Sequence, residues 1–549
     1  MRGGFVACLD GDSGVLDRVV ADLRWHRGSP VCHHAGRLKI VAFTDGSQGP
    51  AVEREGPTIR LVHGAPPAPL RDLQRSARRF AAIEWDGMAL RAARDPFGLV
   101  PIFYRLYRGG VWLATEVHPL VSLEFPGPDL ESLVARAAFS PLENRTGWTD
   151  VRRIFPGSAV EFGPDLVARS TSYWMPERIV GTYRGSRSEA IAELRQRFDT
   201  AVSRCYEPES GILLSGGLDS GWVATTSMST KRGPPHLVHV HYADLPQTHE
   251  ERYAAAVARA VSAPLDTVQG EVAPWDIGAE LDLLGIPYSS LPYGMAEPAL
   301  SHLAGKGIVV ALDGHDGDGV LGPQGSNWGE LLLKGEVQRL ATLCRNYGAL
   351  RALRGLASDF VPPWCRPARY RSRTYLQTVS RYFLEPLKAR IAQEDIDLWR
   401  WPSIRWRMRQ LKPLLSRTMV SFEQKEIEAA RHGMDLRHPF ADRDLVEFLI
   451  SLPCAIKADD GRKKSLLLDA VGDDLPELVR NRPKSDYMAA VRHRVDPARC
   501  LEGIRASNVR LPHLDYARLF GDGDSNPDSM PLFLLVHLAR AHEFARRAT

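Results

Sequence analysis

The chain has 549 residues, 44% of them hydrophobic and 25% charged, and its 70 basic residues nearly balance 66 acidic ones. A chain of this length exceeds one ordinary core, so we expect two or more domains. The net charge of +4 gives no support for nucleic-acid binding, and no apolar run approaches the ~20 residues of a membrane span. Seven scattered cysteines without a Cys-x-x-Cys pair indicate neither a zinc site nor a disulfide framework, so we expect a cytoplasmic protein.

The first third of the chain is built of short apolar runs separated by Gly, Pro and Asp, such as FVACLDGDSG and LKIVAFTDGSQGP. Runs of this length, rich in β-branched and aromatic residues and bounded by turn residues, predict antiparallel strands and hairpins with a few helices. The sequence therefore predicts a sheet-rich α+β domain over residues 1–180.

From Ser186 onward the pattern changes to alternating helices and strands. SRSEAIAELRQRFDTAVSRC spaces its apolar residues three and four apart, which predicts a helix. The runs GILLS, HLVHVHYAD and GIVVALDG then predict strands, and GWVATTSM and HEERYAAAVARAVS predict the helices between them. Such alternation predicts a parallel sheet with crossover helices. We place this second domain at residues 186–549, with a helical insert at about 325–415.

The motif GILLSGGLDSGW joins an expected strand to an expected helix. Gly216 and Gly217 leave room for an anion to approach the backbone, and Ser215 and Ser220 add hydroxyl donors. Asp219 is suited to hold a magnesium ion against phosphates. The loop lacks the spacing of P-loop NTPases, so transfer of a γ-phosphate is not indicated. By itself the motif fits an ordinary strand-to-helix turn equally well.

A second motif strengthens the phosphate interpretation. GIVVAL is followed by DGHDGDGVLGP, which holds three carboxylates, one histidine and four glycines. In a parallel sheet both loops open onto the same edge. Hydrogen-bond donors on one side and carboxylates on the other suit ATP with Mg²⁺ as cofactor, whereas each loop alone would also fit a solvated turn.

These motifs resemble those of the asparagine synthetase family. SGGLDS is similar to its pyrophosphate loop, and DGHDGDG is similar to its S-G-x-G-[AGS]-D-E motif. RDPFGLVPIFY and WLATEVHPL resemble segments of its N-terminal domain, and GMDLRHPFADRDLVEFLISLP and KKSLLLDAVGDDLPELVRNRPKSDY resemble C-terminal segments. The resemblance implies a glutaminase-like (Ntn-hydrolase-type) α+β sandwich packed on an α/β ATP-pyrophosphatase domain with a parallel sheet and helical additions.

The resemblance also implies a reaction. A substrate carboxylate attacks the α-phosphate of ATP, which gives an acyl-adenylate and pyrophosphate, and an amine then attacks the acyl carbon. The positions that match the family's pyrophosphate, metal and phosphate contacts are Ser215, Gly216, Gly217, Asp219, Ser220, Gly314, Asp318, Lys464 and Lys484. Of these, Asp219 and Asp318 match magnesium-binding acids. Lys484 matches a catalytic lysine that stabilises charge in the amide-forming step.

The N-terminal domain departs from the family at its catalytic position. The family uses a cysteine at position 2, where this chain has Arg2, and a guanidinium is no nucleophile. The nearest cysteine, Cys8, lies inside an expected strand, and LVHGAPPAPL stands where the family has its glutamine-binding stretch. We therefore expect a domain that is inactive as a glutaminase and retained as a structural partner.

The second motif departs from the family at several positions. Its third residue is His315, where asparagine synthetases have Glu and β-lactam synthetases have Tyr, and an imidazole with a pKa near ~6.5 can accept a proton from an attacking ammonium. We expect His315 to be the base, with a hydrogen-bonding role within the loop as the alternative. Asp313 and Asp316 add negative charge near Asp318, and Asp316 is an alternative metal ligand.

Loss of the glutaminase leaves an amine on the substrate itself as the nitrogen source, as in β-lactam synthetases and the macrolactam synthetases of lasso peptides. The sequence thus favours a lasso-peptide cyclase that acts on a precursor core peptide, with a leader-peptide protease as a partner. The alternatives are a β-lactam-type or ammonia-dependent asparagine-forming ligase and a non-catalytic scaffold. Arginines interleaved with tryptophans in the helical insert fit solvated helix faces better than a peptide-docking surface.

Overall fold

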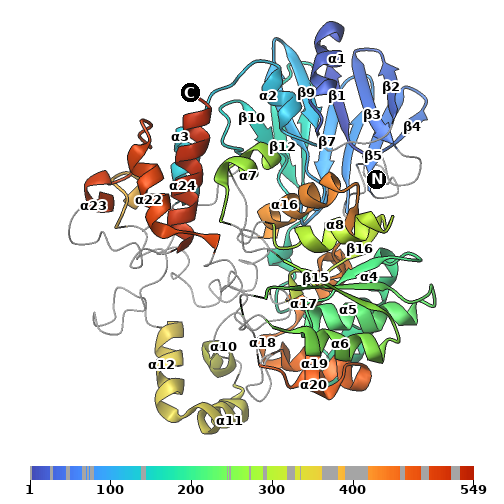
Figure 1. The fold of residues 1–549 in the computed structure, drawn as a ribbon, viewed down its shortest axis with the longest axis vertical. Coiled ribbons are helices and arrows are strands. Elements are labelled where there is room, and N and C mark those ends of the chain that lie inside the picture. The colour runs from blue at the N-terminus through green and yellow to red at the C-terminus, as the bar shows by residue number, and fades with distance from the viewer. Residues whose placement is uncertain are drawn as a thin grey trace.

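The fold is described from a computed structural model, in which Figure 1 traces the chain from the N-terminus to the C-terminus. The structure describes residues 3–24, 29–44, 50–64, 70, 73, 79–137, 144–243, 245, 249–270, 274–287, 294–317, 319, 328–333, 335–360, 381–389, 418–457, 464–483, 494–520 and 532–549.

The N-terminal region contains two antiparallel sheets, each with six strands among the described residues. The first has the order β10-β8-β9-β1-β3-β2, with strands β1 Phe5–Leu9, β2 Ser29–Ala35, β3 Leu38–Thr44, β8 Phe103–Tyr107, β9 Gly110–Ala114 and β10 Val151–Arg153. The second has the order β12-β11-β7-β6-β5-β4, with strands β4 Ala51–Glu55, β5 Thr58–His63, β6 Ala81–Trp85, β7 Leu90–Arg94, β11 Ser158–Phe162 and β12 Ala168–Ser172.

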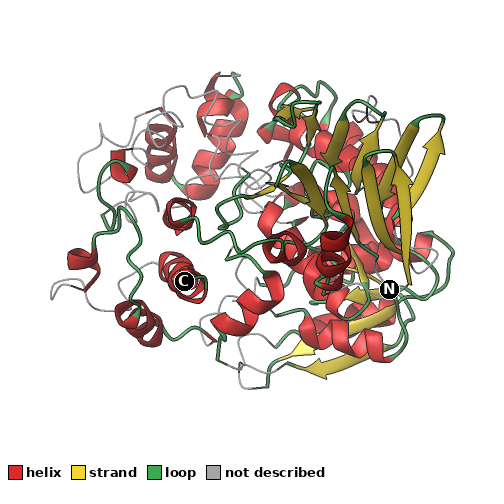
Figure 2. Cartoon of the chain, turned by 90° about the horizontal axis from the view of Figure 1, so that it is seen from above, coloured by secondary structure: helices red, strands yellow, loops and turns green. Residues whose placement is uncertain are grey.

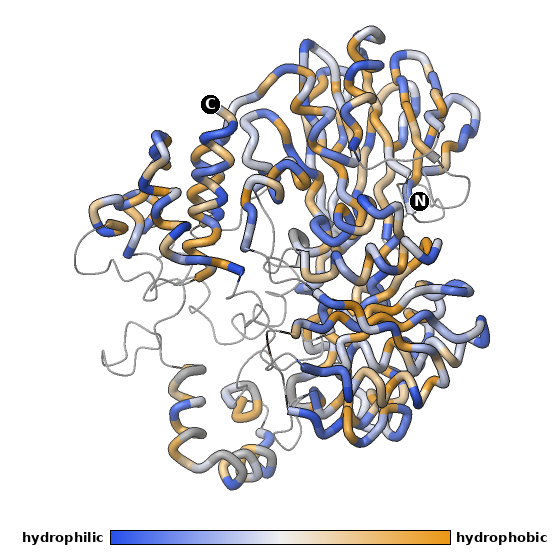
Figure 3. The backbone as a smooth tube through the Cα atoms, viewed as in Figure 1, coloured by the Kyte–Doolittle hydropathy of each residue, from blue (hydrophilic) through white to orange (hydrophobic). Residues whose placement is uncertain are grey.

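The two sheets share one hydrophobic core, as expected for a sandwich. Alternate residues of β1, Phe5, Ala7 and Leu9, are buried in the same cluster as Ile83 of β6 and Phe162 of β11. Because side chains alternate between the faces of a strand, one face of each sheet supplies this cluster. Figure 3 shows hydrophobic residues concentrated along the strands, with hydrophilic residues along many outer turns. The prediction of a sheet-rich α+β region is confirmed.

The C-terminal region is organised around a five-stranded sheet, counted among the described residues, in the order β15-β14-β13-β16-β17. All its pairings are parallel. Its strands are β13 Gly211–Leu213, β14 His236–His241, β15 Leu265–Gln269, β16 Val310–Leu312 and β17 Asp435–Arg437. The predicted parallel sheet and three of its strands are confirmed. Sequence reasoning missed β15, which is partly exposed, and β17, whose single apolar residue stands between two charged residues.

The helices cover the parallel sheet and extend beyond it. The described helices are α1 Ser13–Ala21, α2 His118–Ser122, α3 Leu130–Ala137, α4 Arg187–Cys205, α5 Leu218–Ser229, α6 Glu251–Ala260, α7 Ile277–Leu284, α8 Glu297–Gly305, α10 Trp328–Leu333, α11 Val337–Tyr347, α12 Ala349–Phe360, α16 Thr418–Arg431, α17 Arg443–Ser451, α18 Cys454–Lys457, α19 Ser465–Val471, α20 Glu477–Arg480, α22 Pro497–Ala506, α23 Tyr516–Phe520 and α24 Leu532–Arg547. Short 3₁₀ turns are η2 Pro176–Arg178, η7 Pro439–Ala441 and η8 Gly472–Asp474. The view from above in Figure 2 shows the strands in one half of the molecule and only helices and loops around the C-terminus.

Helix α4 illustrates why the predicted helices form. Ser186 caps its first turn, and Glu189 completes a capping box by accepting a hydrogen bond from the Ser186 backbone nitrogen. Leu194, Phe198 and Val202 are buried on one face, as their spacing predicts. The helix at 186–205 is therefore confirmed to within one residue.

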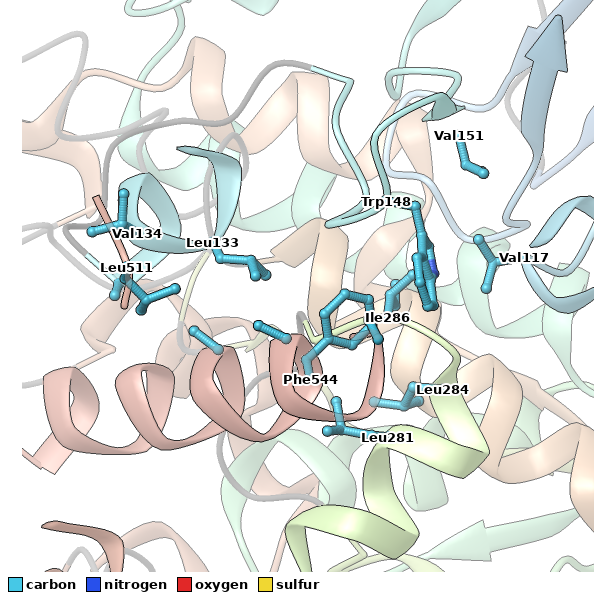
Figure 4. Close-up of a cluster of buried hydrophobic side chains, with 14 of the residues drawn as sticks. Val117, Leu133, Val134, Trp148, Val151, Leu281, Leu284, Ile286, Leu511 and Phe544 are labelled. Carbon is cyan, nitrogen blue, oxygen red and sulfur yellow. The ribbon is translucent and has the colours of Figure 1, made fainter. Parts of the chain in front are cut away.

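A further hydrophobic cluster joins the N-terminal sheets to the last helix, α24. Figure 4 shows Trp148 beside Phe544 of α24, in a cluster that also contains Val117 and Leu284 of α7. The Trp148 and Phe544 rings meet edge to face, with centroids 4.5 Å apart. The chain terminus thus packs against residues from the first third of the sequence. Within the described parts of the chain, none of the helices has the length and apolar character needed to cross a membrane.

Candidate active site

Two glycine-containing loops lie in contact at one edge of the parallel sheet. They follow β13 and β16, which are neighbouring strands with Gly211 paired to Ala311 and Ile212 paired to Leu312. A Cβ added to Gly314 would lie 2.5 Å from the backbone nitrogen of Ser220. The expectation that the two loops meet is therefore confirmed, and the contact requires glycine because any side chain would collide with backbone.

The loop after β13 surrounds the N-terminus of α5. The hydroxyl oxygens of Ser215 and Ser220 lie 3.0 Å apart, and Gly217 donates its backbone N–H to the Ser215 hydroxyl at 3.3 Å. Gly216 has φ of +76°, and a Cβ there would lie 3.0 Å from the backbone of α6 and the residue before it. Since the first N–H groups of a helix have no acceptor within the helix, this edge is suited to bind an anion.

Cationic side chains surround this loop. Lys464, immediately before α19, places its Nζ 2.7 Å from Oδ1 of Asp219. Arg482 lies 2.6 Å from Glu250, and its Nη2 would lie 3.5 Å from a Cβ added to Gly217. Sequence reasoning named Lys464 as a site residue but did not name Arg482, although the R-x-K pattern that contains it was visible in RNRPKSDY. The geometry thus brings Lys464 and Arg482 to the predicted phosphate loop.

The Asp313 carboxylate forms a buried cluster with Lys425 and His438. Its Oδ2 accepts from Lys425 at 3.0 Å, and its Oδ1 lies 2.7 Å from Nδ1 of His438. Burial alone would raise the pKa of Asp313, but these two partners hold that pKa well below its usual range. Lys425 thus balances the negative charge of Asp313. Because Asp318 lies outside the described residues, the expected effect of Asp313 on that residue stays a prediction.

His315 lies on the same loop, and its Nε2 is within hydrogen-bonding distance of the Ser421 hydroxyl of α16. Its ring also meets Phe422 edge to face at 5.3 Å. Burial, and then the charge of Lys425, lowers the pKa of His315 to about 3. The expectation of an imidazole with a pKa near ~6.5 is therefore wrong, because packing against α16 removes the solvent that would stabilise its charged form.

Comparison with known proteins identifies the family to which the chain belongs. A sequence model of the asparagine synthase family matches residues 193–520, which exceeds half of the chain. The chain belongs to the asparagine synthase family. It is 24% identical over 439 residues to "Asparagine synthetase [glutamine-hydrolyzing] 3" of Bacillus subtilis, covering 74% of this chain and 66% of that protein. It is 25% identical over 484 residues to a "Putative asparagine synthetase [glutamine-hydrolyzing]" of Mycobacterium tuberculosis, covering 78% and 70%.

This member of the asparagine synthase family thus spans about two thirds of the length of the curated relatives that it matches. Among solved structures, a glutamine phosphoribosylpyrophosphate amidotransferase from B. subtilis aligns with 49% of this chain and 82% of its own. That alignment has 10% identity and a TM-score of 0.23, a value too low to support a structural conclusion.

The N-terminal region of this family member offers no reactive thiol at Cys8. The residue lies within β1, as predicted, and its side chain is fully buried. Burial raises the pKa of the Cys8 thiol, so little reactive thiolate forms near neutral pH. Cys8 is therefore a core residue of the sandwich. Arg2 lies outside the described residues, and so do residues 65–69 of the glutamine-binding stretch.

Two predicted site residues, Asp318 and Lys484, also lie outside the described residues. Near the same sheet edge the described side chains offer one further group of potential metal ligands, His241, His249 and Glu251, with ligand atoms within 4.8 Å of one another. Nδ1 of His241 already contacts the carboxylate of Glu251. Of the predicted metal ligands, the described residues include Asp219, whose carboxylate contacts Lys464. They also include the alternative ligand Asp316, whose Oδ1 would lie 2.5 Å from a Cβ added to Gly319.

Proposed function

We propose that this protein is an AMP-forming amide ligase, which activates a substrate carboxylate with ATP and joins it to an amine. The observation that supports this most strongly is the contact between the loops after β13 and β16. One loop offers hydroxyl and backbone donors at a helix N-terminus, and the other lies directly against it. Such a site suits pyrophosphate as the leaving group, since donors and cations around it stabilise the negative charge released there.

In this proposal the loop after β13 holds the β- and γ-phosphates of ATP. Ser215 and Ser220 supply hydroxyl donors, and Gly216 and Gly217 let the phosphates approach the backbone. Lys464 exchanges its contact with Asp219 for a contact with phosphate. Asp219 fits Mg²⁺ because a carboxylate beside a phosphate cradle is the oxygen ligand that this ion prefers, and bound Mg²⁺ would neutralise phosphate charge.

Formation of the amide is assigned to the loop after β16 and to Lys484. A neutral imidazole with a pKa of about 3 remains deprotonated at pH 7, so His315 can accept a hydrogen bond from an attacking amine. The same low value makes His315 a poor store for a transferred proton. We therefore propose that His315 orients the amine, and that Lys484 stabilises charge at the acyl carbon.

The substrate is proposed to supply its own amine, as in a lasso-peptide macrolactam cyclase. The burial of Cys8 supports this choice, since it leaves that thiol unable to release ammonia from glutamine. The substrate would then be a core peptide whose N-terminal amine closes on an Asp or Glu side chain, and a leader-peptide protease would be a partner. A β-lactam-type ligase or an ammonia-dependent, asparagine-forming enzyme would use the same loops.

One experiment distinguishes these functions. ATP–pyrophosphate exchange is measured with free aspartate, small N-acyl amino acids and acidic peptides, and products are examined by mass spectrometry for loss of water. Dehydration of a peptide supports the cyclase. Exchange that depends on free aspartate, with capture of ammonia, supports asparagine formation, and dehydration of a small acid supports a β-lactam-type ring.

A non-catalytic scaffold is the remaining alternative. Absence of exchange with every carboxylate tested, in a protein that binds MgATP, would favour the scaffold and contradict the proposed ligase. The matched variant is Asp219→Asn, which keeps the shape of the side chain while removing the charge proposed to act with Mg²⁺.

A further inference from the structure

Helix α16 (Thr418–Arg431) contacts both regions of the molecule through opposite faces. Figure 1 shows it between the antiparallel strands and the parallel sheet. Successive helix residues are about 100° apart, so Ser421 and Lys425 lie on one face while Glu423 and Glu426 lie on the other. The first pair contacts the loop after β16, and the second pair contacts arginines of the N-terminal region.

Glu423 is the centre of the contact with the N-terminal region. Its carboxylate is 2% exposed, and its Oε1 accepts from Arg94 at 2.7 Å while Oε2 accepts from Arg153 at 3.0 Å. Arg94 ends β7 of one sheet, and Arg153 ends β10 of the other. One carboxylate of α16 is therefore bound by an arginine from each sheet of the sandwich.

The Arg94 side chain is rigidly held for this contact. It is fully buried, and its guanidinium also donates to the backbone carbonyls of Gly98 at 2.6 Å, Val100 at 2.9 Å and Ile154 at 3.2 Å. A guanidinium has five N–H donors in a fixed plane, so several backbone contacts determine where it points. The position of Glu423 is thus tied to the backbone of the sandwich.

A second arginine of the N-terminal region contacts another glutamate of α16, about one helical turn beyond Glu423. Arg79, just before β6, donates to Glu426 at 2.7 Å and also lies 2.6 Å from Asp435 of β17. Burial alone would lower the pKa of Arg79, but these two carboxylates raise it. Arg79 therefore connects α16, the edge strand of the parallel sheet and the sandwich through buried charges.

The other face of α16 meets the loop assigned to amide formation. Ser421 lies within hydrogen-bonding distance of His315, and Lys425 donates to Asp313 at 3.0 Å. Since a helix is stiff along its length, a shift at Glu423 moves Ser421 and Lys425 with it. The two sets of contacts are separated by the width of one helix.

We propose that the N-terminal sandwich positions the amide-forming loop through α16, with Glu423 and Arg94 as positioning residues held together by buried charge. This inference rests on the proposed function for its chemical meaning, but its geometry is independent of any substrate. It gives the region that resembles a glutaminase a role without glutamine chemistry. A buried carboxylate with two guanidiniums fixes direction as well as distance, which an apolar contact does not.

The test uses hydrogen–deuterium exchange with mass spectrometry on the full chain, which needs no substrate. Glu423→Gln removes the charge but keeps the shape. We expect exchange to become about tenfold faster in α16 and also in residues 310–317 of the loop. Arg153→Gln, which leaves Arg94 paired, should show a smaller increase in both segments, and Arg153→Lys should restore most of the protection.

The matched control is Glu280→Gln. Glu280 forms an equally buried pair with Arg540 at 2.8 Å, but on α7 and α24 rather than α16. The Glu280→Gln variant should speed hydrogen–deuterium exchange in α7 and α24 and leave residues 310–317 at the wild-type exchange rate.

The proposal is overturned if Glu423→Gln speeds exchange in α16 while residues 310–317 stay unchanged, or if the control loosens that loop equally. If Glu423→Gln does not fold, Arg153→Gln and Arg153→Lys decide the question by the same criterion. A failure of the proposed ligase would appear as absent ATP–pyrophosphate exchange, and it would leave the deuterium result standing.

Discussion

The N-terminal sandwich and the parallel-sheet region differ in how they hold polar side chains. In the sandwich, Arg94 and Arg153 are buried, and both donate to Glu423. At the edge of the parallel sheet, Ser215 is exposed and Asp219 is half-buried, and they contact Ser220 and Lys464. In the proposed function a phosphate and a metal ion replace these contacts, so one region holds a position whereas the other exchanges partners.

The largest effect is expected from removing the charge of Asp219, whose partner is proposed to change when ATP binds. Asp219→Asn should lower ATP–pyrophosphate exchange by about a hundredfold to a thousandfold, because the proposed metal contact and its charge are lost together. Asp165→Asn, at an exposed pair in the sandwich, is the control and should retain wild-type exchange. Equal activity in both variants would show that Asp219 has no role in the reaction.

A smaller effect is expected from crowding the phosphate loop. Gly216→Ala places a Cβ against the backbone at 3.0 Å and should weaken MgATP binding by about tenfold to a hundredfold, measured by calorimetry. Gly87→Ala in the sandwich has a similar positive φ of +92° but open space around it. It should cost about 1 kcal/mol of stability and leave MgATP affinity unchanged. Similar affinities in the two variants would contradict the proposed cradle.

Acid should destabilise the C-terminal region through His542, which is buried, and His315, which is half-buried. Burial lowers the pKa of His542 to about 4 and that of His315 to about 3. The unfolded chain, with histidine pKa values near ~6.5, then binds more protons below that pH, so the free energy of unfolding falls as the pH falls. The stability these residues provide is fully present above about pH 6.5.

We expect a loss of about 1 kcal/mol per histidine between about pH 7 and 5.5, measured by urea unfolding. His542→Gln and His315→Gln should each reduce this slope, whereas His34→Gln on the exposed face of β2 should not. An unchanged slope in all three variants would show that other groups cause the acid sensitivity.

The smallest effect is expected at Cys8. Ammonia release from glutamine should stay at background in the wild type and in Cys8→Ala, because the thiol is enclosed in β1. The variant should cost only about 1 kcal/mol of stability through loss of packing. Glutamine turnover above background that survives this mutation would contradict the proposal that the sandwich has no glutaminase activity. Turnover abolished by it would contradict the assignment of Cys8 to the core.

The sequence predicted the parts of the fold that depend on local pattern. Alternation and spacing indicated the sheet-rich first region, helix α4 and the strands β13, β14 and β16. The strands β13 and β16 are as short as β17, but they lie in the apolar runs GILLS and GIVVAL. The strand β17 was missed because its apolar Leu436 stands between Asp435 and Arg437. The positions of Asp318 and Lys484 lie outside the described residues, so their assignments stay predictions.

By itself, the sequence determined that two loops rich in glycine each follow a strand of a parallel sheet, because strand and turn preferences are local. The structure then showed that those two strands, β13 and β16, are neighbours. Only the tertiary structure decided where the charges between those loops point. Asp313 faces Lys425, which is 112 residues away, and Arg94 faces Glu423, which is 329 residues away. Such pairs depend on how whole elements pack, and burial then shifts the pKa of His315, which no spacing along the chain reveals.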